Sequence, residues 1–403
     1  MKLKRNCPIC GVNVGELLHH IEFAKGKDEF VPSMYSIVSC YGCGFVFNDT
    51  SWNQLDYNKY YSATSKYTGL DTIGAGGISE SEIKRYNRQI DRFREYIPSF
   101  DSSIVDIGCA KGGLLRTLQK EGYANLYGVD ASEECLSFLD AFGIKSIQAS
   151  LDNLDVINMQ FDLVILSQVL EHVYDLQSML ESVSGILKNG GMLYVEVPNA
   201  KTYGELLFGP FYYFDFEHIN HFSEEYLELL FSKHFKCVFS SSSIEYNECF
   251  CLLQKCTQHK AATIIINEYH NRILSYILNS LKTNRLIYQY VSCLNCSGYV
   301  FFWGTGAYLR AQIEKGIFIP IKKNIRGLID KNKNLWGQSV HCGFMEMDIH
   351  IFSPDVLENC SCEDAVFITS VLYQAEIYNE LKTRAFKGKI YNLCGNEYIE
   401  MSI

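Results

Sequence analysis

The chain has 403 residues, of which 47% are hydrophobic and 20% charged, a composition that excludes a disordered or fibrous protein and predicts two or three folded domains. Its 36 Lys and Arg residues against 46 Asp and Glu residues give a net charge of −10, so the overall charge favours neither nucleic acid nor an anionic membrane as a partner. No run of eighteen apolar residues is present, and no apolar stretch follows the charged start. We therefore expect a cytoplasmic protein with no membrane insertion.

Two Cys-x-x-Cys pairs stand near the start of the chain, separated by 29 residues. They are Cys7 with Cys10 and Cys40 with Cys43, and a glycine directly follows each pair. Four thiolates complete the tetrahedral shell of a zinc ion and leave no open position for a catalytic water. In a reducing compartment this spacing predicts a structural Zn²⁺ site. We interpret the other twelve of the 16 cysteines as core or surface thiols.

The sequence next predicts a Tyr-rich loop over 57–67, a helix near 79–96 and then short apolar runs that alternate with helical periods. This alternation predicts a parallel α/β sheet with helices on both faces. Its expected strands are 104–107, 126–129, 144–147, 161–166 and 192–197, followed by two antiparallel edge strands at 235–241 and 249–253. A helical connector and a second α/β series follow, with the connector over 261–294 and strands near 299–303, 325–329, 365–368 and 389–392.

A glycine-containing turn joins the first expected strand to a helix that starts near Leu114. The turn reads Asp106-Ile-Gly108-Cys-Ala-Lys-Gly112. Glycine lets the backbone pass close beneath a ligand, and the helix N-terminus offers free N–H groups. Asp130 ends the next strand, where a carboxylate can accept hydrogen bonds from a ribose diol. Dinucleotide-binding proteins use the same geometry, so the glycine spacing alone leaves the cofactor open.

Together with Asp152 after the third strand and the segment 161–173, this turn resembles the class I S-adenosylmethionine-dependent methyltransferases. The resemblance implies S-adenosyl-L-methionine as the cofactor. It places Gly108 under the methionine part, and Asp152 or Asn153 near the adenine. The full set of cofactor-binding residues that it implies is Asp106, Gly108, Gly112, Asp130, Asp152 and Gln168. We interpret His172, near the fourth strand, as structural.

The order of the modules resembles the sugar C-methyltransferases that modify nucleotide-linked deoxysugars. In that family a Glu-His pair carries the chemistry, and Glu217-His218 matches it. The resemblance implies that His218 removes the C3 proton of a 4-keto sugar while Glu217 orients the imidazole. The enolate carbon then accepts the methyl group. The expected partner is a small-molecule substrate, a nucleotide-linked sugar, and the oligomeric state stays open.

Several features depart from that family. Asp215 stands where a tyrosine is expected, although Tyr212 and Tyr213 are close in sequence. The ending Glu217-His218-Ile-Asn-His221-Phe-Ser is also common in O-methyltransferases, in which His221 is the better-known histidine. One alternative is therefore methylation of a glycan, lipid or small-metabolite hydroxyl. A second is a non-catalytic zinc-ribbon binding protein.

The C-terminal series begins with Gly304-Thr305-Gly306, which lacks the third glycine of a dinucleotide fingerprint and has Leu309 in its place. The family resemblance assigns this module to shaping the nucleotide-sugar cleft. We therefore expect a zinc-binding module with its Tyr-rich connector (1–70), a methyltransferase core (71–258), a helical linker (259–298) and a C-terminal Rossmann-like domain (299–403).

Overall fold

The computed structural model describes residues 1–26, 30–63, 76–150, 153–205, 209–256, 266–370, 373–394 and 397–401. The chain forms two compact units, each assembled from segments far apart in the sequence. Unit 1 comprises Met1–Glu16, Val38–Thr202 and Glu217–His270, and unit 2 comprises Leu17–Ile37, Tyr203–Phe216 and Asn271–Ile403. The four segments predicted from the sequence divide the chain differently and remain predictions.

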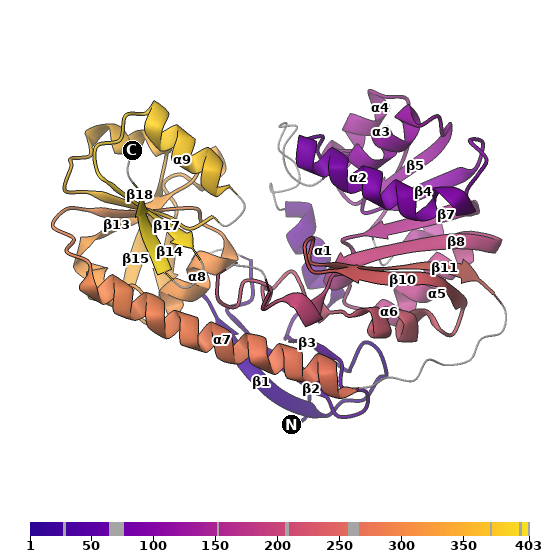
Figure 1. Cartoon of the computed structure of the whole chain (residues 1–403), viewed down its shortest axis with the longest axis horizontal. Helices are drawn as coiled ribbons and strands as arrows, with labels where there is room; N and C mark the ends of the chain where they lie inside the picture. The colour runs from indigo at the N-terminus through magenta and orange to yellow at the C-terminus, as the bar shows by residue number, and fades with distance from the viewer. Residues whose placement is uncertain are drawn as a thin grey trace. The chain divides into compact units, whose positions relative to one another are not determined.

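A seven-stranded sheet forms the centre of unit 1 (Figure 1). In spatial order its strands are β10 (Phe235–Ser243), β11 (Glu248–Lys255), β8 (Leu187–Pro198), β7 (Phe161–Ser167), β4 (Ser103–Ile107), β5 (Asn125–Asp130) and β6 (Lys145–Gln148). The strands from β6 to β8 pair in parallel, as predicted, whereas β11 runs antiparallel to both β8 and β10. Of these two antiparallel strands, only β10 lies at an edge of the sheet. The prediction that both were edge strands is wrong for β11, whose residues 249–253 are all buried.

Helices cover both faces of this sheet, as the alternating pattern predicted. The helices α2 (Glu80–Phe93), α3 (Gly113–Lys120) and α4 (Glu133–Asp140) lie on one face, and α5 (Leu176–Ile186) and α6 (Glu224–Phe231) lie on the other (Figure 1). Tyr86, Ile90 and Phe93 of α2 recur at helical spacing and are buried in the core. Each such side chain contributes about 1.5–3 kcal/mol through burial.

A second sheet of four strands carries the N-terminal cysteines. Its order is β1 (Gly15–Glu22), β2 (Met34–Cys40), β3 (Val46–Asp49) and β9 (Asn220–His221), and helix α1 (Gln54–Ala63) follows β3. The short β9 pairs antiparallel with β3, with Val46 opposite His221. Arg5 is buried beside this sheet, and its guanidinium donates to the carbonyls of Val173 and Tyr174. These contacts hold the N-terminal segment against the residues of unit 1 that follow β7.

Unit 2 contains the second α/β sheet. Its strands, in spatial order, are β14 (Ser339–Cys342), β15 (Met347–Phe352), β13 (Ile325–Ile329), β12 (Val300–Trp303), β16 (Ala365–Ile368), β17 (Lys389–Cys394) and β18 (Glu397–Met401). The five central strands are parallel and the two outer ones antiparallel. Its helices are most of α7 (Ile266–Cys293), α8 (Ala307–Glu314) and α9 (Gln374–Thr383). Among the described residues, no helix is both long and apolar enough to cross a bilayer.

A buried ionic network ties α2 to the central sheet of unit 1. Arg92 donates to the hydroxyl of Tyr194 (2.8 Å) and to Glu196 Oε2 (2.6 Å), and its other amino group pairs with Glu248. The side chains of Glu196 and Glu248 are 0% and 4% exposed. Glu248 also has Arg88 at 3.5 Å, whereas the ion pair of Glu196 is with Arg92. Removing Arg92 therefore leaves the buried Glu196 without its ion-pair partner, which is more costly than losing a surface pair.

We predict that Arg92→Ala lowers the free energy of unfolding by about 3–5 kcal/mol, because Glu196 loses its buried counter-ion. Urea denaturation followed by circular dichroism measures the change. Arg94→Ala is the matched control, because Arg94 pairs with the exposed Asp91, and its loss costs about 1 kcal/mol or less. Equal effects of the two substitutions would contradict the role given to Arg92.

Candidate active site

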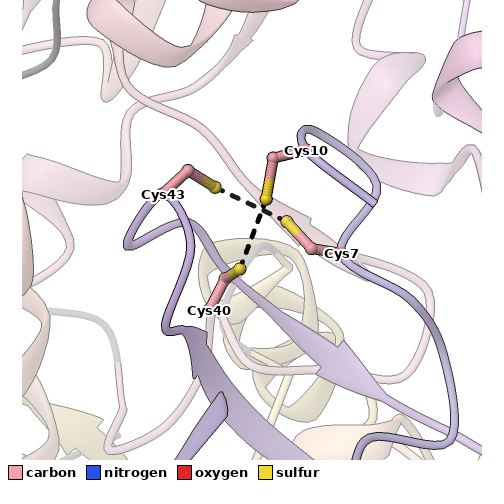
Figure 2. Close-up of side chains that lie close together, drawn as sticks. All are labelled: Cys7, Cys10, Cys40 and Cys43. Atoms are coloured by element: carbon pink, nitrogen blue, oxygen red, sulfur yellow. Dashed lines mark hydrogen bonds between the residues drawn. The ribbon is translucent and has the colours of Figure 1, made fainter. Parts of the chain in front are cut away.

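The four predicted zinc ligands lie together in unit 1. Figure 2 shows the thiols of Cys7, Cys10, Cys40 and Cys43 converging from two tight turns. The Sγ atoms of Cys7 and Cys43 are 3.6 Å apart and those of Cys10 and Cys40 are 3.5 Å apart. Four sulfurs around zinc at about 2.3 Å lie about 3.8 Å from one another, so the cluster is compatible with a tetrahedral zinc ion.

The local sequence explains this geometry. Gly11 and Gly44 have φ angles of 75° and 77°, and each donates its N–H to the carbonyl of the first cysteine of its pair at 2.8 Å. Side chains of the helices α5 and α6 support the turns from outside. The hydroxyl of Tyr226 on α6 donates to the carbonyl of Cys43 (2.7 Å), and the amide of Gln177 on α5 donates to Pro8. We infer a structural role for the cluster because a four-cysteine shell leaves zinc without an open position.

We predict that Cys43→Ser removes bound zinc and lowers the stability of the purified protein by several kcal/mol, because metal-binding energy is folding energy at such a site. Elemental analysis gives the zinc content and thermal unfolding gives the stability. Cys362→Ser replaces an exposed cysteine outside the cluster and should change neither. Full zinc content in Cys43→Ser would contradict the assignment.

A cavity of about 540 Å³ opens at the carboxyl ends of the parallel strands of unit 1. It is lined by the turn after β4, by the ends of β5 and β7, and by α1 and α2. Of the predicted cofactor residues, Asp106, Gly108, Asp130 and Gln168 line it. Asp152 lies outside the described residues. Gly112 does not line the cavity but precedes α3, where its φ of 73° lets the turn enter the helix.

The turn after β4 has little room for side chains. Gly108 has a φ of 74°, and a Cβ placed on it would lie 2.8 Å from Cγ2 of Val169. Its N–H and that of Cys109 both donate to the carbonyl of Val129, which ties the turn to the end of β5. At the end of β7, Gln168 also has a left-handed backbone, with φ of 58°. Left-handed residues concentrate where a backbone bends around a ligand.

Two carboxylates face this cavity from adjacent strand ends. Asp130 accepts hydrogen bonds from the N–H groups of Ala110 and Ser132, both at 2.9 Å. Burial raises the pKa of Asp130, and these N–H donors oppose that rise. Burial and the neighbouring Asp130 raise the pKa of Asp106 to about 8, although Arg85 works in the opposite direction. The cavity therefore favours a cationic ligand, which would stabilise the ionised form of both groups.

Helix α2 contributes two residues that the sequence analysis did not single out. Arg85 and Glu82 line the cavity, and they form an ion pair at 2.9 Å. An amphipathic helix ahead of the first strand was expected, but its pattern does not tell which of its charged residues turn inward. Lys59 of α1 is a further cation in the lining.

Two of the three predicted catalytic residues, Glu217 and His218, belong to a polar cluster beside the cavity. The hydroxyl of Tyr60 donates to Glu217 Oε1 (2.8 Å), and the hydroxyl of Tyr61 lies 3.1 Å from Nδ1 of His172. The ring of His218 packs edge-on against that of His172, with the centroids 4.8 Å apart. His172 itself lines the cavity. Both tyrosines left unassigned by the sequence thus contact the polar cluster of Glu217, His218 and His172.

Both of these histidines belong to a set of side chains that could bind a metal ion. Donor atoms of Glu171, His172 and His218 lie within 4.8 Å of one another. A carboxylate with two imidazoles is a donor set found at divalent metal sites.

The third predicted catalytic residue, His221, occupies a different environment. It is fully buried on β9, and its Nε2 lies 3.0 Å from Oδ1 of Asn48. Burial lowers the pKa of His221 to about 3, with smaller contributions from His218 and Arg5, so its imidazole is neutral. The Asn48 amide also donates to the carbonyl of His218 (3.2 Å).

Tyr212 and Tyr213, the nearby tyrosines considered in place of Asp215, belong to unit 2. Tyr213 is buried and stacks on Tyr203, with ring centroids 4.3 Å apart. Tyr212 contacts Tyr213 edge-on.

Comparison with known proteins identifies the class of domain in unit 1. Residues 79–234 match a family described as a methyltransferase domain. That segment contains both the cofactor turn and the Glu217–His221 segment. With the sheet order described above, this match defines a class I S-adenosylmethionine-dependent methyltransferase domain.

Among curated proteins, the ubiquinone biosynthesis O-methyltransferase of Xylella fastidiosa is 28% identical over 118 residues, which are 28% of this chain and 48% of that protein. The mitochondrial enzyme of the same name from Homo sapiens is 32% identical over 112 residues, covering 25% of this chain and 30% of that protein. The chain thus spans half or less of the length of these two relatives. Among solved structures, the N-methyltransferase NodS from Bradyrhizobium japonicum, in complex with S-adenosyl-L-homocysteine, is 14% identical, covers 49% of this chain and 98% of its own, and has a TM-score of 0.39.

We predict that S-adenosylmethionine binds more tightly as the pH rises from 6 to 8, by at most about tenfold per pH unit. The free protein holds the pKa of Asp106 near 8, so below that pH a cationic ligand must displace a proton. Above pH 8 the ligand's own amino group loses its charge and the gain ends. Isothermal titration across this range measures the slope. Asp106→Asn should remove the slope, whereas Asp101→Asn, on an exposed turn, should keep it; a flat profile for the unaltered protein would contradict the prediction.

Proposed function

We propose that this chain is an S-adenosylmethionine-dependent methyltransferase whose acceptor is a sugar, namely the carbon next to the carbonyl of a nucleotide-linked 4-keto deoxysugar. The observation that carries the proposal is the cluster of Tyr60, Glu217, His172 and His218 beside the cavity at the strand ends. A carbon acceptor needs a base and neighbouring hydrogen-bond donors within one site. The cluster supplies both kinds of group.

In this proposal the cavity residues bind the cofactor. Asp130 accepts hydrogen bonds from the ribose diol, and Asp106 balances the positive charge of the methionine part. Arg85 is the cavity cation that would pair with the cofactor's carboxylate, and its Nε is buried without a hydrogen-bond partner among the described residues. When bound, S-adenosylmethionine supplies an electrophilic methyl group on its sulfonium.

The polar cluster prepares the acceptor. His218 removes the proton from the carbon next to the sugar carbonyl, and Glu217, held by the Tyr60 hydroxyl, orients the neighbouring groups. Hydroxyl donors such as Tyr61 stabilise the developing enolate oxygen. We assign His221 a positioning role, because its neutral, buried imidazole is bound to the amide that also holds the His218 backbone.

Methylation of a hydroxyl is the second candidate, favoured by the curated relatives named as O-methyltransferases. The same cluster can serve it, since transfer to oxygen requires deprotonation and in-line placement of the acceptor. The two functions differ in one measurable step. Carbon methylation requires exchange of the acidic proton of a 4-keto sugar with solvent deuterium, in the presence of the demethylated cofactor. Failure of such exchange, with methyl gain on oxygen, would overturn the carbon proposal and support the second candidate.

We predict that His218→Asn lowers kcat by about 10²- to 10⁴-fold, the usual contribution of a general base, while cofactor affinity changes by less than about threefold. Mass-detected methyl transfer to a panel of nucleotide-linked sugars gives kcat, and titration gives the affinity. His234→Asn is the control, because His234 pairs with Glu181 at an exposed site outside the cavity. Unchanged turnover in His218→Asn would assign the base to another residue.

A further inference from the structure

A half-buried lysine in unit 2 lies beside a histidine on an aromatic ring. Lys315 directly follows α8, and its ammonium nitrogen is 3.5 Å from the ring centre of Phe211 and 3.4 Å from Nε2 of His19. The His19 ring stacks on Phe211, with centroids 4.4 Å apart and planes 7° from parallel. The three residues come from separate segments of unit 2: β1, the segment 203–216 and the end of α8.

The backbone at this point is held in an uncommon conformation. Phe211 has a φ of 60°, which a bulky side chain rarely adopts. Its N–H donates to the hydroxyl of Ser280 on α7 (3.1 Å), and its ring is only 5% exposed. Strain of this kind persists where the surrounding contacts enforce it, and such positions concentrate at ligand sites.

Within the described part of the chain, no carboxylate is paired with either of these two basic groups. Glu314, next to Lys315 in the chain, directs its carboxylate at the N–H groups of Gly343 and Phe344, at about 3 Å. Among the described residues, Lys315 forms no ion pair with any carboxylate, and the further charged group that affects His19 is the basic His20. Burial lowers the pKa of Lys315 to about 8, and burial together with Lys315 lowers that of His19 to about 4.

We propose that Lys315 and His19 form a binding site for a diphosphate group. Two adjacent nitrogen donors match the oxygens of a phosphoryl group, which form strong charge-assisted hydrogen bonds. A ligand with at least two negative charges can balance both basic groups at once, whereas chloride or a single carboxylate balances one. In a chain with a net charge of −10, such a ligand needs a local cationic site of this kind.

The site would bind the anionic part of the substrate. Phe211 precedes Glu217 by six residues in the same stretch of chain. This connection to methyl transfer rests on the proposed function, whereas binding of the diphosphate does not.

Titration of the full chain with inorganic pyrophosphate at pH 6.5 tests the proposal. We expect binding that Lys315→Met weakens at least about tenfold, the loss typical of one charged hydrogen bond. Lys322→Met, on the exposed turn η5 (Ile319–Asn324), is the matched control and should change the affinity less than twofold. No binding, or equal affinity in Lys315→Met and the unaltered chain, would overturn the site.

The number of protons taken up on binding is a second measurement, which a purely structural role of Lys315 and His19 would not change. Because His19 gains its charge when the anion binds, the complex should take up protons, and affinity should rise as the pH falls from 8 towards 5. His19→Phe keeps a stacked ring and should abolish this uptake. Uptake that persists in His19→Phe would contradict the role of His19.

Two further titrations separate the possible outcomes. Thymidine diphosphate binding at least as tightly as pyrophosphate identifies a nucleotide as the source of the diphosphate, and weaker binding identifies free diphosphate. Titration of the same samples with S-adenosylmethionine tests the methyltransferase function independently. Loss of one result with retention of the other shows which proposal has failed.

Discussion

The arrangement of the polar cluster of Glu217, His218 and His172 depends on one buried amide. Asn48 on β3 donates to the carbonyl of His218, and its oxygen lies within hydrogen-bond distance of Nε2 of His221. Asn48 and His221 are fully buried, and a buried polar group left unpaired costs about 1–3 kcal/mol, so the pairing of β3 with β9 has one favourable register. Helix α1 begins five residues after β3 and carries Tyr60 and Tyr61. The same strand pairing therefore places these tyrosines near Glu217 and His172. Cys40 of the N-terminal cysteine cluster ends the neighbouring strand β2.

The two units carry local sites that favour ligands of opposite charge. In unit 1, two carboxylates at adjacent strand ends are buried around a cavity, where ionising both is costly unless a cation binds. In unit 2, Lys315 and His19 lie 3.4 Å apart, and no carboxylate of the described residues pairs with them. An S-adenosyl cofactor is cationic at its sulfonium and amino groups, whereas a nucleotide-linked sugar is anionic. The cationic cofactor thus meets carboxylates in unit 1, and the anionic substrate meets basic groups in unit 2. The acidic net charge of the chain alone would not provide a site for the anionic substrate.

The choice between carbon and oxygen as the acceptor depends on the surroundings of the base. Removing a proton from carbon requires an aligned base together with donors for the oxyanion, because water cannot supply preorganised dipoles inside a closed site. The ring of His172 packs against that of the predicted base, His218, and the hydroxyls of Tyr60 and Tyr61 contact Glu217 and His172. His221 is less suited to the same task, since its environment disfavours the protonated form that a base must adopt.

Much of this protein could be predicted from local sequence. The strand and helix pattern is set by the hydrophobic periods of 2 and 3.6, so the parallel order from β6 to β8 and the second α/β sheet followed from the sequence, as did the clustering of Cys7, Cys10, Cys40 and Cys43. The order of the strands at the β10 edge of the sheet did not follow from the sequence, because the position of β11 depends on which neighbouring strands bury it. The contacts of Tyr60 and Tyr61 with Glu217 and His172, and the pairing of Lys315 with His19, join residues distant in the chain. His218 and His221 are close in sequence, yet only His221 is fully buried. Only the tertiary structure decides such contacts, since burial and charge at a side chain are properties of everything packed around it and not of its sequence neighbours.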